Sequence, residues 1–133
     1  MRDPWERIQD MLEAIHRIEK YSSRGRKVFD SDELIQIYIL HYLQVLGEAA
    51  YKVPQDFRKK YPEIPWGSLQ SLRHILVHDY FQVDLKVVWG MVEKDLPDLK
   101  GKLQDIQLPG AQETPGVYKA RKPRSISRKR KKK

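Results

Sequence analysis

Apolar residues recur at three- and four-residue steps along most of the chain, which is the spacing of one helix face. The first such stripe follows Asp3-Pro4, an aspartate cap with a proline in the first helical turn. Its members are Ile8, Met11, Leu12, Ile15 and Ile18. We therefore predict a first helix that starts at Pro4 and fades over residues 22–25.

The next helix is predicted to be the most buried one. Its start lies at Asp30 or Ser31, because Asp30 together with Glu33 resembles a capping box. Residues 34–53 are rich in Leu, Ile, Tyr and Ala, and Pro54 ends the pattern. We expect this segment to lie at the centre of the fold.

The pattern of residues 54–103 predicts two more long helices. Residues 54–58 are typical of a short helical turn, and residues 61–65 of a connector. Residues 66–79 have helical spacing, with Leu69, Leu72 and Leu76 on the inner side. Asp84 is expected to cap a last helix that runs to about residue 103, and Pro97 predicts a kink or a short break in it.

The fold class that follows is all-α, a compact bundle of four to five helices, because no strand alternation competes with the helical spacing. Periodicity is lost after Leu108, where Pro, Gly, Thr, Ser and then basic residues take over. We expect one domain over residues 1–108 and a disordered, flexible tail over residues 109–133.

Composition excludes several classes of protein. The chain has 133 residues and no cysteine, which rules out disulfides, Cys-ligated zinc or iron–sulfur sites and a thiol nucleophile. No apolar run approaches the ~18 residues of a membrane span, and the N-terminal residues are charged. We therefore expect a cytoplasmic protein with neither a membrane span nor a signal peptide.

The net charge of +8 belongs to the tail. Ten of the 26 basic residues and none of the 18 acidic residues lie within residues 119–133, so the remaining 118 residues carry 16 basic and 18 acidic groups, a net charge of −2. Four roles for the tail stay open: extra affinity for RNA, contact with an anionic membrane, contact with an acidic partner surface, or a solvated end.

Candidate chemistry lies in the 66–79 helix. On an ideal helix His74 and His78 point roughly away from the leucine side, toward solvent or a partner. Their i, i+4 spacing suits a metal, but no Glu follows the first His and no third ligand can be nominated, so we predict no metal site. His16 and His41 stand alone and are expected to be structural or exposed.

Arg73 and His78 offer a different chemistry, phosphodiester cleavage without a metal. An imidazole can move the protons of a ribose 2′-hydroxyl and a leaving 5′-oxygen, and a guanidinium can stabilise the phosphate. The alternative is an ordinary polar helix face. The two side chains are about 140° apart on an ideal helix. Both side chains can act on one phosphate in three ways. The long Arg73 side chain can curve around the helix, the end of the helix can be irregular, or two copies of the helix can face each other.

Arg73-x4-His78-x-Tyr80 resembles the R-x4-H-x-Y signature of the HepT-like toxins, a branch of the HEPN ribonucleases. The surrounding sequence resembles that family from about residue 3 to residue 107, and the basic tail does not. The matching stretches are LGEAA at 46–50, KYPEIPW at 60–66, LVHDYFQVDLKVVW at 76–89 and DLPDL at 95–99.

The resemblance implies a HEPN bundle that forms a homodimer, with the motifs of both subunits in a shared cleft. It implies a prokaryotic, metal-independent endoribonuclease that needs no cofactor, cleaves tRNA or mRNA and leaves a 2′,3′-cyclic phosphate. Such a protein is the toxin of a type VII-like toxin–antitoxin pair. Its partner is an MntA-like nucleotidyltransferase antitoxin, which neutralises it by AMPylation of the motif tyrosine. A catalytically silent nucleotide- or RNA-binding subunit of a nucleotidyltransferase is the alternative.

Carried over residue by residue, Arg73 binds phosphate, His78 is the catalytic histidine and Tyr80 is the modified tyrosine. His74 stands where the family commonly has Asn, so it either binds RNA or acts as a second proton carrier. Two carboxylates are supporting candidates, each with a plain structural alternative. Glu48, in the most apolar helix, needs a partner such as Arg73, and Asp79 either orients His78 or is solvated.

Overall fold

The computed structural model describes residues 3–107, which are helical with no strand in that range. The α-helices are α1 (Pro4–Ser22), α2 (Arg26–Ser31), α3 (Glu33–Tyr51), α4 (Gln55–Lys60), α5 (Trp66–His78), α6 (Leu85–Gly90) and α7 (Leu96–Ile106). A 3₁₀ turn, η1 (Tyr80–Gln82), follows α5, and a π-helical turn, η2 (Met91–Asp95), joins α6 to α7. The predicted all-α bundle is confirmed, and the predicted tail lies outside the described residues.

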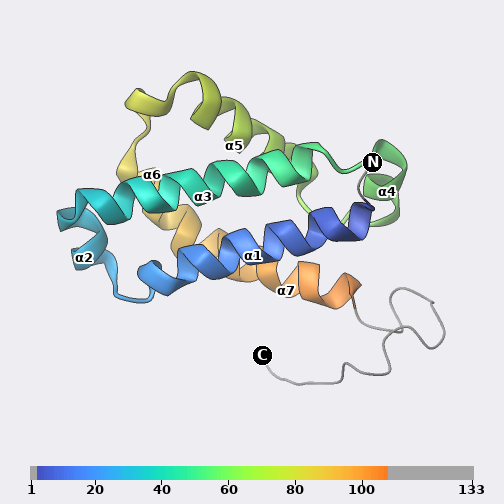
Figure 1. The fold of residues 1–133 in the computed structure, drawn as a ribbon, viewed down its shortest axis with the longest axis horizontal. Helices are drawn as coiled ribbons and strands as arrows, with labels where there is room; N and C mark the ends of the chain where they lie inside the picture. The colour runs from blue at the N-terminus through green and yellow to red at the C-terminus, as the bar shows by residue number, and fades with distance from the viewer. Residues whose placement is uncertain (1–2, 108–133) are drawn as a thin grey trace. The chain divides into compact units, whose positions relative to one another are not determined.

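The described chain up to Leu103 forms one compact unit, and the described residues after it are the end of α7. Within that unit α3 packs against α1 on one side and α5 on another, as Figure 1 shows. Their shared core is made of fully buried side chains, among them Ile8, Met11, Ile15, Ile18, Ile39, Leu43, Leu46 and Leu76. Burying each such side chain is worth about 1.5–3 kcal/mol, so α3 is fixed at the centre of the unit.

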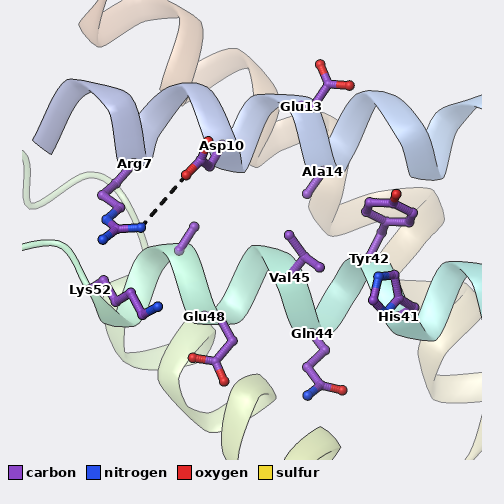
Figure 2. Close-up of a pocket in the computed structure, with 11 residues that line it drawn as sticks. Arg7, Asp10, Glu13, Ala14, His41, Tyr42, Gln44, Val45, Glu48 and Lys52 are labelled. Atoms are coloured by element: carbon purple, nitrogen blue, oxygen red, sulfur yellow. Dashed lines mark ion pairs between the residues drawn. The ribbon is translucent and has the colours of Figure 1, made fainter. Parts of the chain in front are cut away.

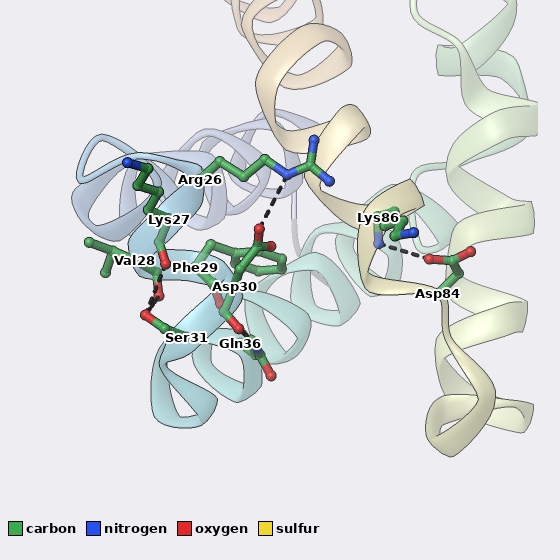
Figure 3. A network of polar contacts seen from close by, with 9 residues as sticks. All are labelled: Arg26, Lys27, Val28, Phe29, Asp30, Ser31, Gln36, Asp84 and Lys86. Atoms are coloured by element: carbon green, nitrogen blue, oxygen red, sulfur yellow. Dashed lines mark hydrogen bonds and ion pairs between the residues drawn. The ribbon is translucent and has the colours of Figure 1, made fainter.

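The predicted caps of the first and last helices are confirmed. The Asp3 carboxylate accepts a hydrogen bond from the Trp5 amide at 2.7 Å, ahead of Pro4. The Asp84 carboxylate accepts one from the Lys86 amide at 2.8 Å and starts α6 (Figure 3). In both cases a short acidic side chain satisfies an amide that the helix itself leaves without a partner.

The predicted start of the second helix was wrong. Asp30 and Ser31 belong to the separate short helix α2, and Asp32 caps α3 by accepting from the Leu34 and Ile35 amides. Figure 3 shows how the corner is closed, since Gln36 donates hydrogen bonds to the carbonyls of Phe29 and Asp30. The extra helix turns the chain sharply into α3, and hydrophobic spacing alone did not reveal it.

The irregularity predicted at Pro97 takes the form of the π turn η2 and not of a break. Proline has no amide hydrogen, and its ring collides with the carbonyl four residues earlier in a regular helix. In η2 the Leu96 amide donates to the Met91 carbonyl, five residues back, which widens the turn just before the ring. No helix within residues 3–107 has the length and apolar composition needed to cross a membrane.

Candidate active site

The Arg73 guanidinium of α5 is held against the last turns of α3. Its Nε lies 3.1 Å from Oε1 of Glu48, and its Cζ lies 4.0 Å from the centre of the Tyr51 ring. The Nε hydrogen makes no aligned hydrogen bond, so the contact with Glu48 is a charge pairing. A pair whose side chains are 28% and 35% exposed contributes at most about 1 kcal/mol to stability. Its main effect is therefore to orient Arg73.

The position of Arg73 also depends on Gly47, one residue before Glu48. A Cβ atom at Gly47 would lie 2.9 Å from Cβ and 3.2 Å from Cα of Arg73. Only glycine therefore lets α3 and α5 approach this closely beside the arginine. Within residues 3–107 the terminal Nη groups of Arg73 enter no hydrogen bond or ion pair, which leaves them available to an anion.

His74 and His78 occupy the exposed face of α5, as their helical spacing predicted. Their ring centroids are 4.5 Å apart, with the ring planes inclined by 47°. This spacing brings two imidazoles into contact in the C-terminal half of α5. The pair can exchange and hold protons beside a bound substrate.

The residues after His78 leave the helix at once. Asp79 caps α5 through its amide, which donates to the Ile75 carbonyl at 2.7 Å, and its carboxylate has no partner in the described chain. Tyr80 begins the 3₁₀ turn and packs edge-on against Phe81, which is 97% exposed. No hydrogen bond of the described residues uses the Tyr80 hydroxyl. This hydroxyl is thus chemically available.

The structure brings the predicted residues together as two groups. Glu48 meets Arg73, as the sequence suggested, and His74 meets His78. Within residues 3–107 no hydrogen bond, ion pair or ring contact joins Arg73 to His78. The same residues contain no cluster of three or more metal-binding side chains. A single chain therefore presents an oriented guanidinium and an imidazole pair on neighbouring faces of one helix.

Sequence reasoning missed two residues of this arrangement, Gly47 and Tyr51. A signal existed, because a glycine inside the most apolar helix weakens that helix and indicates a close approach of another element. Tyr51 lies three residues after Glu48 and four after Gly47, so it shares their helix face. Which residue of which helix would fill the space beside them was not readable from the spacing.

Comparison with known proteins gives one consistent result. The family model described as Ribonuclease HepT-like matches residues 11–106. A Thermococcus cleftensis protein named "Probable ribonuclease HepT" is 36% identical over 104 residues, covering 75% of this chain and 92% of that protein. A Methanocaldococcus jannaschii protein described as a candidate RNase is 30% identical over 98 residues, covering 73% and 90% of the two chains.

A second Methanocaldococcus jannaschii protein is longer, and this chain covers 45% of it. It is described as a gamma-glutamylcyclotransferase and candidate RNase, and it is 35% identical over 100 residues, or 74% of this chain. No solved structure gives a significant match.

Proposed function

Because the chain belongs to the HepT-like ribonuclease family, we propose that it is a metal-independent endoribonuclease acting through Arg73 and His78. The observation that carries the proposal is the setting of Arg73. Its guanidinium is oriented by Glu48 and Tyr51 of α3, and its Nη groups are left available, while the same helix carries an exposed imidazole pair. Cleavage of a phosphodiester without a metal needs a cation that stabilises the phosphate and a group that moves protons.

The proposed reaction uses the 2′-hydroxyl of RNA as its nucleophile. One imidazole removes the hydroxyl proton, and the 2′-oxygen forms a bond to phosphorus. The bond from phosphorus to the 5′-oxygen breaks, and that oxygen receives a proton from a protonated imidazole. The products are a 2′,3′-cyclic phosphate and a free 5′-hydroxyl. His78 is the acid or the base, and Arg73 stabilises the charge that builds on the phosphoryl oxygens.

The working form that we propose is a homodimer. Large apolar side chains remain exposed on the same two helices that carry the site, Leu34 and Ile37 on α3 and Ile75 and Val77 on α5. Exposed apolar residues on neighbouring helices are typical of a subunit interface. A two-fold contact through this surface would bring the imidazole pairs of both subunits into one cleft.

The test is cleavage of tRNA or mRNA by purified, unmodified protein in EDTA. Wild-type protein should cleave it, and His78→Ala and Arg73→Ala should each lose at least ~100-fold in rate, as expected when a proton carrier or a charge-stabilising group is removed. His16→Ala is the matched control, because His16 is an exposed histidine of α1. RNA binding without cleavage in the wild type would instead favour a catalytically silent regulatory subunit.

We further propose that the protein is the toxin of a type VII-like toxin–antitoxin pair in a prokaryotic cytoplasm. Its antitoxin would be an MntA-like nucleotidyltransferase that transfers AMP from ATP to the Tyr80 hydroxyl and releases pyrophosphate. The added phosphate would compete for Arg73 and the adenosine would block the cleft. After co-expression with such a partner, the intact mass should rise by ~329 Da per AMP, and Tyr80→Phe should prevent the rise. An unshifted mass with full inhibition would contradict this proposal.

A further inference from the structure

A groove of about 330 Å³ runs between α1 and α3, and Glu48, the partner of Arg73, is one of the residues that line it. Figure 2 shows its two ends, with Arg7 and Lys52 at one and Tyr42 and His41 at the other. This volume is in the range of small-molecule sites in proteins. The lining residues are Arg7, Asp10, Glu13, Ala14, His41, Tyr42, Gln44, Val45, Glu48, Ala49 and Lys52.

The centre of the groove is apolar and unfilled because the residues that line it there are small. Ala14 of α1 and Val45 of α3 project into the space between the helices (Figure 2), and Ala49 lines the same space. Helices packed through large side chains would fill this space, so the groove depends on these small residues. An apolar floor bordered by polar groups suits a ring such as a nucleobase, which has apolar faces and polar edges.

The acidic side chains of the groove are balanced by arginines. Asp10 lies 3.9 Å from Arg7, and Glu13 accepts a hydrogen bond from Arg17 at 2.9 Å. This hydrogen bond raises the pKa of Arg17, so the arginine stays charged at physiological pH. Glu48, the third carboxylate, pairs with Arg73. These pairings remove most of the charge that would repel an anion.

Lys52 supplies a cation at one end of the groove. It is exposed, and none of the residues 3–107 forms an ion pair with it. Lys52 directly follows Tyr51, whose ring packs against the Arg73 guanidinium. Lys52 therefore lies at the same end of α3 as Glu48 and Tyr51, the two residues that contact Arg73. Glu48 both contacts Arg73 and lines the groove.

We propose that this groove binds the nucleotide next to the scissile phosphate of the substrate RNA. The base would lie on the floor formed by Ala14, Val45 and Ala49, and the adjoining phosphate would pair with Lys52. The inference rests on the proposed ribonuclease function and adds a specificity subsite to it. It assigns α1, which carries none of the motif residues, a direct role in choosing the substrate.

The first test combines substrate and protein changes. Single-turnover cleavage is measured on a short RNA in which one base at a time beside the cleaved bond is replaced by an abasic unit. Wild-type protein should lose about 10-fold in rate at one position, the cost of a lost base contact. Val45→Phe, which fills the floor, should slow the intact RNA about as much and show no further loss at that position. A full abasic penalty in Val45→Phe would overturn the subsite.

The second test does not depend on cleavage or on Val45→Phe folding. Binding of an RNA with a 2′-deoxy unit at the cleaved position is measured across salt concentrations. Lys52→Ala should weaken binding and reduce the slope of log affinity against log salt by about 0.7, the value for one phosphate contact on a single strand. Lys94→Ala, which removes an exposed lysine of η2, should leave the slope unchanged.

The two tests separate failure of the subsite from failure of the function. Wild-type cleavage that depends on His78 but shows equal slopes for Lys52→Ala and wild type would reject the subsite alone. Absence of cleavage would reject the ribonuclease function, and the binding slopes would still decide whether the groove holds RNA. If free AMP binds the wild type but not Val45→Phe, and both bind RNA equally, the groove serves a free nucleotide and the proposal is overturned.

Discussion

Gly47 and Arg73 lie in contact where α3 packs on α5. This close approach of the two backbones determines where the Arg73 guanidinium lies. The charge pairing with Glu48 and the ring of Tyr51 each contribute about 1 kcal/mol or less at such exposure. Neither could hold the arginine if the backbones were moved apart. The missing side chain at Gly47 is therefore as important for the site as the groups that touch the guanidinium.

Gly47→Ala should destabilise the protein although it improves the helix propensity of α3. Alanine in place of glycine gains about 0.5–1 kcal/mol in a helix, whereas forcing a methyl group into a packed contact costs about 1–3 kcal/mol. The steric cost should exceed the gain in helix propensity, because the added Cβ would lie 2.9 Å from Arg73 Cβ. Urea unfolding should show a net loss of about 1 kcal/mol, together with slower RNA cleavage.

Gly101→Ala is the matched control for this prediction. It changes a helical glycine of α7 whose added Cβ would meet nothing within 4 Å, so it should raise the free energy of unfolding. If Gly47→Ala gained as much stability as Gly101→Ala and kept full activity, the close approach of α3 to α5 would not govern Arg73.

At the scale of elements, the sequence predicted the helices whose ends carry explicit signals. Asp3 with Pro4 and Asp84 marked starts that the structure confirms. The predicted start at Asp30 was wrong because three consecutive residues, Asp30 to Asp32, have acidic or hydroxyl side chains that can each cap a helix. Which of them caps α3 depends on how the chain turns between α2 and α3, and this tertiary arrangement cannot be read from the local sequence.

Asp32→Ala should therefore lower stability by about 1 kcal/mol, the usual cost of losing a capping side chain. Its carboxylate accepts from two amides of α3, at 3.0 and 3.2 Å. Asp30→Ala removes only an exposed ion pair with Arg26 at 3.4 Å, worth about 0.5 kcal/mol or less. Thermal unfolding of the two variants compares them directly, and an equal or larger loss for Asp30→Ala would contradict the assignment of the cap.

At the scale of the whole molecule, the basic residues that dominate the net charge are separate in sequence from the residues of the candidate site. The described residues place Arg73 and both histidines on α5, within a body of net charge −2, and the ten basic residues of 119–133 lie outside them. The sequence predicted the exposed imidazole pair from helix geometry. It also indicated that Glu48 needs a partner and offered Arg73 as one candidate, which the structure places in contact with it. It gave at most an indication at Gly47, a glycine inside an apolar helix, and it could not identify Arg73 as the residue that packs beside Gly47 and Tyr51, because that contact arises only where two helices meet.

The separation of Arg73 from His78 within one chain leads to a prediction about the dimer. If each site takes Arg73 from one subunit and His78 from the other, a heterodimer of Arg73→Ala with His78→Ala retains one complete site. Heterodimers purified with two different tags should then have about half the activity of the wild type, although each parent homodimer is inactive. The activity is measured as RNA cleavage in EDTA at equal dimer concentration.

The reciprocal heterodimer provides the control. A wild-type subunit paired with a subunit carrying both Arg73→Ala and His78→Ala has no complete site if the sites are shared between subunits. It keeps one complete site if each subunit acts alone, so the two models predict opposite activities for the two heterodimers. Activity in the reciprocal heterodimer and none in the first would show that Arg73 bends round to His78 in its own chain. The orientation that Glu48 and Tyr51 impose on Arg73, toward α3, argues for the shared site.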